Sequence, residues 1–170
     1  MRVLRPKNAK KDTTTVTHVV GIGESCVEST GILATHALGS CIAVCLWEER
    51  LHLAGLLHFM LPSSEGNTTR KDRPGLYADT GIDLLVGQMQ ARGADLRLVR
   101  ARLIGGSSIA GTSAFAVGQR NITAARRRLW SRRITVDAED VAGQIPRTVR
   151  MRTIDGRVLV TSPNRTDLIL

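Results

Sequence analysis

The sequence predicts a single compact domain of the α/β (α+β) class, a sandwich with a mixed or antiparallel sheet core, a central hairpin and two main helices. Short apolar runs with strand spacing recur along most of the chain. Two segments have the apolar periodicity of helices. The 170 residues are 42% hydrophobic and contain no internal repeat or long linker. A chain of this length can bury one hydrophobic core.

The central hairpin is predicted from two apolar runs, 42–47 and 53–61, separated by a polar break at 48–50. A turn centred between positions 49 and 50 would pair Cys41 directly with His58. Their side chains would then lie on the same face of the sheet, with Cβ atoms roughly 4.5–5.5 Å apart. At that separation a thiol and an imidazole can share a proton.

Two helices are expected. In 79–92 one apolar face is formed by Ile82, Leu85, Val86 and Met89. Asp79 or Thr80 would cap its start and Gly93 its end. A second helix over 118–131 would turn Ile122, Ala125 and Leu129 inward.

Further strands are expected at 16–22, 31–38, 99–104 and 134–138. A second hairpin is predicted within 148–163, where Asp155-Gly156 matches the positive backbone angles of a type I′ turn. Residues 1–15 are expected to form a flexible basic arm, 16–162 the folded domain, and 163–170 a C-terminal tail.

No apolar run approaches the roughly 18 residues that a membrane helix needs. The basic N-terminus lacks the apolar core of a secretory signal. These features predict a cytoplasmic protein without membrane insertion. The three cysteines (Cys26, Cys41 and Cys45) are expected to be reduced, because an odd number in such a chain indicates no disulfide framework.

The formal charge of +9 favours acidic partners. Six arginines lie within 120–133, where they form either a solvated helix face or a docking surface for an acidic helix or nucleic acid. Aromatic residues make up only 3% of the chain, which disfavours base stacking. A helix-turn-helix is disfavoured too, since a Gly/Ser loop precedes the arginines. An acidic protein is therefore the favoured partner.

Cys41 and His58 are the candidate catalytic pair, as nucleophile and general base. Gly39 and Ser40 precede the cysteine, and glycine there lets a substrate approach the backbone. The competing interpretation is that Cys41 is a small buried hydrophobe and His58 a core histidine. Spacing alone favours that interpretation.

A metal site is not predicted. Cys45 should face the same side as Cys41, so these cysteines with His58 and His36 could be considered as zinc ligands. The two cysteines would lie about 13 Å apart on a regular strand, too far to share one tetrahedral ion. The glycine-rich GIGES and LIGGSS match no phosphate-binding motif. Instead Gly105, Gly106 and Ser107 are expected in a tight loop beside the site.

Several motifs resemble the CheD chemoreceptor glutamine deamidases. They are T-x-x-x-G-S-C from Thr35 to Cys41, G-L-x-H-F-M-L-P from Gly55 to Pro62, YADTGIDLL, RLIGGS, GQRN (118–121) and AEDVAG (138–143). In the order of that family they cover about residues 16–160. The resemblance implies a compact α/β sandwich of the kind also seen in deamidating bacterial toxins. It also implies hydrolysis of selected glutamine amides on methyl-accepting chemotaxis receptors, without a metal or organic cofactor.

The resemblance assigns the nucleophile to Cys41, the general acid and base to His58, and the orientation of His58 to Thr35. A thioester at Cys41 would be hydrolysed to glutamate, with backbone N–H groups around Gly39 and Ser40 as oxyanion support. Some members of the family bind a CheC-type phosphatase. Here Ala142 and Pro146 depart from the family's Gly-Gly-x-x-Gly-Arg pattern, which argues against that partner. The alternative function is a basic adaptor for signalling proteins or nucleic acid without catalysis.

Overall fold

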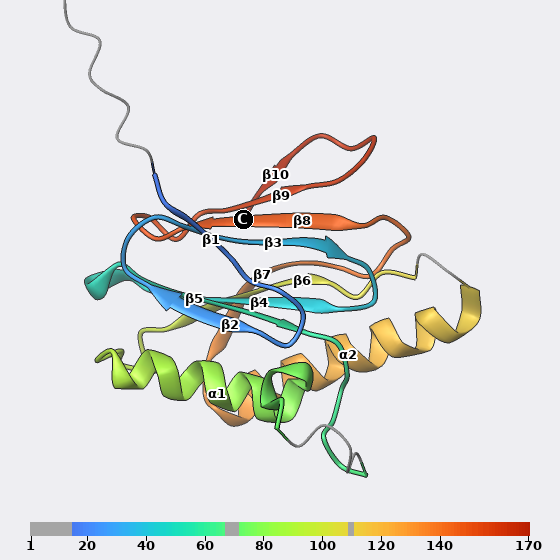
Figure 1. Cartoon of the computed structure of the whole chain (residues 1–170), viewed down its shortest axis with the longest axis horizontal. Helices are drawn as coiled ribbons and strands as arrows, with labels where there is room; N and C mark the ends of the chain where they lie inside the picture. Colours follow the sequence, from blue (N-terminus) through green and yellow to red (C-terminus); the bar gives the residue numbers. More distant parts are fainter. Residues whose placement is uncertain (1–14, 67–71, 109–110) are drawn as a thin grey trace, which may run out of the picture.

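The computed structural model describes residues 15–66, 72–108 and 111–170, and of 111–115 it describes the backbone alone. The expected basic arm lies almost entirely outside the described residues. The described chain folds into three layers, in which two β-sheets stack face to face and two helices cover the outer face of one sheet (Figure 1). This α/β sandwich confirms the predicted fold class.

The first sheet has the strand order β1-β3-β8-β9-β10 and the second has the order β2-β5-β4-β6-β7. Both are mixed, because the β1–β3 and β6–β7 pairs are parallel and the other pairs antiparallel. The strands are β1 (Thr17–Val19), β2 (Ser25–Glu28), β3 (Ile32–Leu38), β4 (Ile42–Glu48), β5 (Leu53–Phe59), β6 (Arg100–Gly105), β7 (Thr135–Val141), β8 (Arg147–Arg152), β9 (Val158–Thr161) and β10 (Leu168–Ile169). The helices are α1 (Ala78–Ala91) and α2 (Gly111–Ser131), with short 3₁₀ helices η1 (Glu49–Leu51) and η2 (Pro74–Leu76).

Strand β4 lies in the middle of the second sheet and is buried on both faces. Ile42, Val44 and Leu46 pack toward the helices. Cys45 and Ala43 point the other way, into the core between the sheets. This double burial explains why the strand is a nearly continuous apolar run rather than an alternating one.

The two predicted helical faces are confirmed. Ile82, Leu85, Val86 and Met89 of α1 are buried, as are Ile122, Ala125 and Leu129 of α2. Gly93 follows α1 with a φ of +90°, as expected of a helix-terminating glycine. The expected cap at the start of α1 is wrong, because the helix begins after Tyr77 without a side-chain cap. The Asp79 carboxylate instead accepts hydrogen bonds from the preceding loop, at Ser63 and Ser64.

The central hairpin forms, but its predicted register is wrong by two residues. Its loop contains η1 and then His52 in the left-handed conformation, with a φ of +47°. This longer loop pairs Ala43, not Cys41, with His58. Because side chains alternate with a period of two, the shift leaves Cys41 and His58 on the same face.

The C-terminal hairpin forms between β8 and β9, but the expected type I′ turn does not. Of the Asp155-Gly156 pair only the glycine has a positive φ, at +67°, and the chain takes a wider turn over 153–157. Beyond β9, the segment 163–170 contributes β10, which pairs with β9 at the sheet edge. Among the described residues, no helix is both long and apolar enough to cross a membrane.

Two segments near the start of the chain differ from expectation. The expected strand over 16–22 is only three residues long, and residues 20–24 leave it as a loop. The short strand β2, which the sequence pattern does not predict, then pairs with β5 at the edge of the second sheet. Loop 20–24 therefore passes from one sheet to the other, and it crosses beside His58.

Candidate active site

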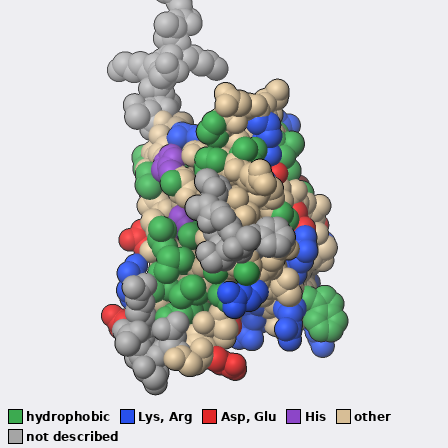
Figure 2. All heavy atoms as spheres, turned by 90° about the vertical axis from the view of Figure 1, so that its right-hand side faces the viewer, with side chains coloured by type: hydrophobic (Ala, Val, Ile, Leu, Met, Phe, Trp, Pro, Cys, Tyr) green, Lys and Arg blue, Asp and Glu red, His purple; other side chains and the backbone are tan. Residues whose placement is uncertain are grey.

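Cys41 ends the short connection that carries the chain from β3 to β4. It lies one residue before β4 and is 9% exposed. Its side chain belongs to the core between the two sheets. The view of Figure 2 faces this end of the molecule, where β3 passes into β4 and β5 ends, and Lys and Arg side chains gather over its lower right part.

The loop of Gly105, Gly106 and Ser107 packs against the backbone of this connection. The Gly106 N–H donates to the Cys41 carbonyl oxygen (2.8 Å), and the Ser107 N–H donates to that of Gly39 (2.8 Å). Gly105 has a φ of +117°, and a Cβ there would lie 2.3 Å from the Cys41 carbonyl oxygen. Only glycine allows this approach. The structure thus places this loop directly against the backbone of Gly39 and Cys41.

His58 and Thr35 form a buried hydrogen-bonded pair between the sheets. The Thr35 hydroxyl donates to the Val20 carbonyl oxygen (2.7 Å) and lies 2.8 Å from Nδ1 of His58. A hydroxyl has one proton, and a carbonyl oxygen can only accept. Nδ1 must therefore carry the hydrogen and donate it to Thr35. Nε2 is left as an acceptor, and it is buried without a hydrogen-bond partner among the described residues.

Cys41 and His58 are diagonal neighbours on their common face, since His58 is paired with Ala43 two residues along. Diagonal positions have Cα atoms about 7–8 Å apart, with Cβ atoms somewhat closer. The imidazole of His58 extends its Nε2 away from Thr35, on the face that also carries the thiol. The two side chains therefore share a face, and among the described residues no hydrogen bond joins them.

Both groups are neutral at pH 7. Burial raises the pKa of the Cys41 thiol, although a hydrogen bond from its own backbone N–H opposes part of this rise. Burial lowers the pKa of His58 to about 4. The resting site is therefore a thiol beside a neutral imidazole rather than a preformed ion pair. A neutral imidazole with a free Nε2 is the form that can accept a proton.

Loop 20–24 holds the backbone of His58. The Gly23 N–H donates to the His58 carbonyl oxygen (2.7 Å), and the His58 N–H donates to that of Glu24 (3.1 Å). The Val20 N–H in turn donates to the Ala34 carbonyl oxygen (2.8 Å). This loop therefore fixes both His58 and the acceptor of the Thr35 hydroxyl. No sequence pattern identified Val20, because it contributes only its backbone.

Asn121 of α2 is a further residue that the sequence analysis did not assign to the site. It is fully buried, and its Nδ2 donates to the carbonyl oxygens of Ser40 (2.8 Å) and Met60 (2.9 Å). One amide group therefore joins the residue before Cys41 to the segment that follows His58. The only sequence signal was the GQRN motif, which ends at this residue.

We expect Asn121→Asp to lower kcat at least as much as Asn121→Ala, with little change in KM. An ionised carboxylate keeps the shape of the amide but cannot donate to the two carbonyl groups. Each variant should also lose about 1–3 kcal/mol of unfolding free energy, because buried acceptors are left unpaired. Steady-state kinetics and urea unfolding measure the two effects. An Asn121→Asp variant with unchanged kcat would contradict this positioning role.

Ser107 connects the site to the chain that follows β7. Its hydroxyl donates to the Ile145 carbonyl oxygen (2.7 Å), and the buried Arg147 donates to the same hydroxyl and forms an ion pair with Asp140. Within this segment Ala142 has a φ of +65°. That backbone conformation favours glycine, and Ala142 adopts it although it carries a side chain.

These features define a class of α/β protein in which a thiol and an oriented, neutral imidazole lie between two stacked sheets, at the ends of neighbouring strands. Comparison with known proteins identifies the family. Residues 60–162 match the sequence model of CheD, described as chemotactic sensory transduction. The chain belongs to the CheD family.

Named relatives cover most of the chain. A probable chemoreceptor glutamine deamidase CheD 2 from Anaeromyxobacter dehalogenans is 43% identical over 84% of this chain and 92% of its own length. A probable chemoreceptor glutamine deamidase CheD 1 from Syntrophus aciditrophicus is 41% identical, over 77% of this chain and 83% of its own. The chemoreceptor glutamine deamidase CheD from Thermotoga maritima is 36% identical, over 84% of this chain and 89% of its own.

Proposed function

We propose that this protein hydrolyses glutamine side-chain amides of chemoreceptors to glutamate, through a thioester at Cys41. The observation that carries the proposal is the hydrogen-bond geometry of His58. Since Thr35 donates to Val20, Nδ1 of His58 is protonated and Nε2 is a free base on the face that carries the thiol. The names of the relatives supply the substrate.

In the first half of the reaction, Nε2 of His58 takes the proton of the Cys41 thiol as the sulfur attacks the glutamine carboxamide carbon. The C=O double bond opens to an oxyanion, for which the backbone N–H groups around Ser40 and Cys41 are the proposed donors. The C–N bond then breaks, and the imidazolium gives its proton to the departing ammonia. The product is a thioester.

In the second half, His58 takes a proton from water as the oxygen attacks the thioester carbon. The C–S bond breaks and the proton returns to the sulfur. The net change is the addition of water to glutamine and the release of ammonia, with Cys41 and His58 restored. The reaction needs a reduced thiol, which the cytoplasm maintains.

The direct test incubates the protein with receptor fragments and measures the mass of their glutamine peptides. Deamidation adds about one dalton, because NH₂ is replaced by OH in the acyl transfer. Ammonia should be released in equal amount without any added amine. The absence of both changes with a reduced, folded protein would contradict the proposal.

We expect Thr35→Val to lower kcat by about 10-fold or more, because the hydroxyl that orients His58 is lost. The change keeps the volume but leaves Nδ1–H of His58 and the Val20 carbonyl unpaired, at a cost of about 1–3 kcal/mol in unfolding free energy. Thr35→Ser keeps the hydroxyl and should retain most of the activity. If Thr35→Ser and Thr35→Val were equally impaired, methyl packing rather than the hydroxyl would be the cause.

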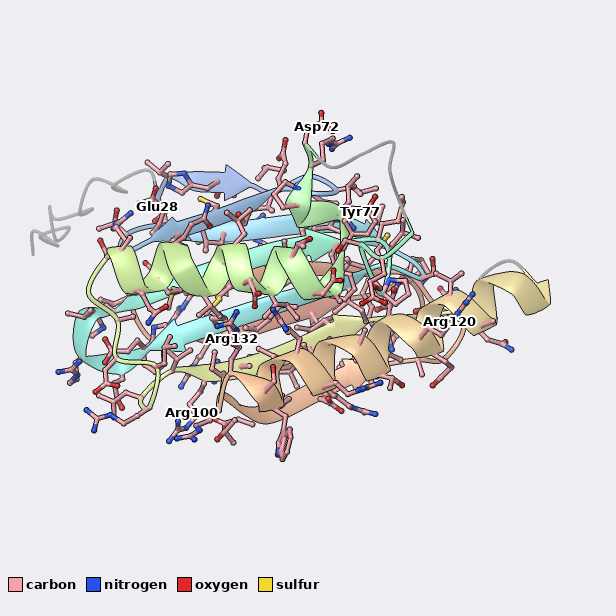
Figure 3. The ribbon with its side chains drawn as sticks, turned by 90° about the horizontal axis from the view of Figure 1, so that it is seen from below. Glu28, Asp72, Tyr77, Arg100, Arg120 and Arg132 are labelled. Carbon is pink, nitrogen blue, oxygen red and sulfur yellow. The ribbon has the colours of Figure 1, made fainter. Side chains whose placement is uncertain are left out.

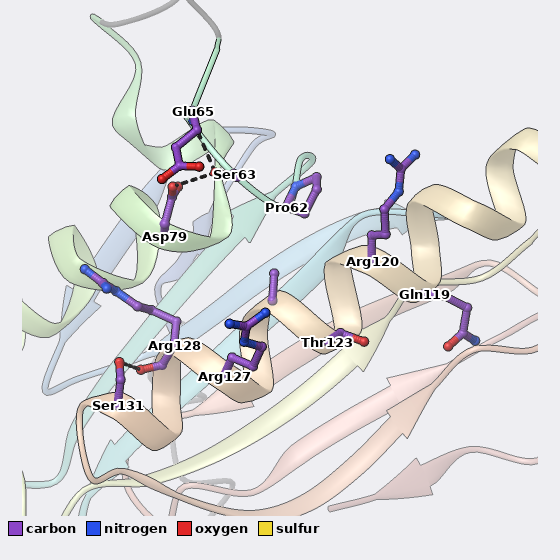
Figure 4. Close-up of a pocket in the computed structure, with 11 residues that line it drawn as sticks. Pro62, Ser63, Glu65, Asp79, Gln119, Arg120, Thr123, Arg127, Arg128 and Ser131 are labelled. Carbon is purple, nitrogen blue, oxygen red and sulfur yellow. Dashed lines mark hydrogen bonds between the residues drawn. The ribbon is translucent and has the colours of Figure 1, made fainter.

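The open groove between α1 and α2 supports docking of an acidic receptor helix. Pro62, Glu65 and Asp79 line one side of it. Arginines of α2 line the other side (Figure 4). Arg128 and Arg132 are paired with Asp83, and Arg126 with Glu139. Among the described residues, Arg120 and Arg127 are exposed and form no ion pair. Their charge is therefore available to a partner.

We expect the double variant Arg120→Glu/Arg127→Glu to lower kcat/KM for receptor fragments by about 10-fold at low ionic strength, because the chain's net positive charge steers an acidic helix. The difference from the unaltered protein should shrink as salt is added. A short uncharged glutamine peptide should be hydrolysed equally by the double variant and by the unaltered protein.

The matched control is Arg97→Glu/Arg157→Glu, which changes the net charge by the same amount at exposed positions outside α2. Steering by α2 predicts a clearly smaller effect in this control. Equal effects in the two double variants would mean that only net charge matters.

A further inference from the structure

Three side chains with metal-ligating atoms meet at one edge of the two-sheet core, apart from Cys41 and His58. They are His18 of β1 and Cys26 and Glu28 of β2, all half-buried. One ligand atom from each lies within 4.8 Å of the other two. Figure 3 places Glu28 at the margin of the sheets, near the end of α1. None of the three takes part in the proposed reaction.

The strand pairing explains why these side chains face one another. β1 and β2 are edge strands of different sheets, so no further strand covers the gap between them. His18 is in register with Leu33, and Cys26 with Leu56, and both leucines are buried in the core between the sheets. Paired residues share a face of a sheet. His18 therefore points inward from one sheet, and Cys26 and Glu28 from the other.

The donor set is an imidazole nitrogen, a carboxylate oxygen and a thiol sulfur, which would bind metal as the thiolate after losing its proton. This combination suits Zn²⁺, whereas Mg²⁺ and Ca²⁺ prefer oxygen ligands alone. Three protein ligands leave the fourth tetrahedral position to water. Arg92 is the one charged partner, at 3.7 Å from the Glu28 carboxylate, and among the described residues the side chains of His18 and Cys26 form no hydrogen bond. The ligand atoms of His18 and Cys26 are thus free, and an ion would replace Arg92 as the charged partner of Glu28.

We propose that His18, Cys26 and Glu28 form a Zn²⁺ site that joins the two sheets at the base of loop 20–24. The loop leaves β1 just after His18 and enters β2 just before Cys26. Between these points it holds the Thr35 hydroxyl through Val20 and the His58 backbone through Gly23 and Glu24. A bound ion would restrict the motion of both ends of this loop. Metal binding would therefore rigidify the surroundings of His58 without touching the reacting atoms.

The test uses the full chain with Cys41→Ala, so that the Cys41–His58 pair cannot contribute a second thiolate site. Titration with Co²⁺, a spectroscopic substitute for Zn²⁺, should give one equivalent of binding with a thiolate-to-cobalt charge-transfer band, and Zn²⁺ should displace it. Adding His18→Ala, Cys26→Ser or Glu28→Gln should weaken binding by at least about 10-fold, in the range seen when metal sites lose supporting groups. The matched controls His36→Ala and Cys45→Ala should bind like the parent.

Two further measurements need only the full chain with Cys41→Ala, so they do not depend on whether the ligand variants fold. Zn²⁺ should slow alkylation of Cys26 and slow hydrogen exchange of the Gly23 and His58 amides, which are bonded within the loop contacts. Absence of the cobalt–thiolate band, or unchanged alkylation of Cys26 at saturating Zn²⁺, would overturn the site. None of these readouts requires deamidase activity, so they stand or fall separately from the proposed reaction.

Discussion

Replacement of Cys41 by alanine is expected to abolish glutamine deamidation, with kcat falling by at least about 10⁴-fold, as happens when a catalytic nucleophile is removed. Without the sulfur no thioester can form, and neither His58 nor water held by it provides an equivalent nucleophile. The fold should persist, because one small side chain at the end of a strand is lost. Ammonia release and peptide mass measure the reaction, and urea unfolding measures the fold.

Cys45→Ala is the matched control for this experiment. Cys45 lies on β4, four residues after Cys41, and points into the same core. It is fully buried, and burial raises the pKa of its thiol to about 12. A buried thiol of this kind is inert. The variant should lose some stability from the cavity and keep its activity. A folded Cys41→Ala variant that still deamidates glutamine would exclude the proposed nucleophile.

His58→Gln should lower kcat/KM by about 10²–10⁴-fold, the usual contribution of a positioned general acid and base. The pH profile of the unaltered protein gives a second test. Since burial lowers the pKa of His58 to about 4, the imidazole remains a base well below pH 6.5. With a short peptide substrate, the acid limb of kcat/KM should therefore lie below pH 6. An acid limb near pH 7 would contradict a desolvated His58 as the base.

The same pKa shift predicts how stability depends on pH. Between about pH 4 and 6.5 the unfolded chain binds a proton at His58 that the folded chain does not bind. Stability therefore rises with pH across this window and falls as the solution is acidified. Protonation of His58 lowers the free energy of unfolding by up to about 3 kcal/mol between the two ends of this window. This pH-dependent loss of stability should be absent from the His58→Gln variant. Denaturant unfolding of the variant and the unaltered protein at several pH values checks this.

The local patterns of the sequence were sufficient for the helices and for the central strand. The apolar face of α1 follows from a period that any amphipathic helix must have, and β4 is apolar on both sides because a layer covers each of its faces. The turns were less predictable. Loop 49–52 and the turn near Gly156 adopt conformations that depend on how the strands leave the sheet, so residue preferences there predicted the wrong register and the wrong turn type.

In the candidate site, too, some features follow from local sequence patterns and others only from tertiary packing. Cys41 and His58 could be placed on one face from the sequence, because an error of two residues in register does not change the face. The hydrogen bonds around them could not be derived from strand spacing, and Thr35 was assigned only through the family resemblance. Thr35 comes from the other sheet, Val20 contributes only a carbonyl group, and Asn121 reaches the site from a helix far along the chain. Contacts between separate layers leave no periodic signal.

The sequence by itself thus determined the fold class, the buried faces of the helices, the family motifs and the cysteine and histidine that share a face, because each of these depends on local spacing. Only the tertiary structure decided which nitrogen of His58 carries the proton, how far burial shifts the pKa values of Cys41 and His58, and which side chains meet at the edge of β1 and β2. These properties depend on desolvation and on distances between segments that only folding brings together.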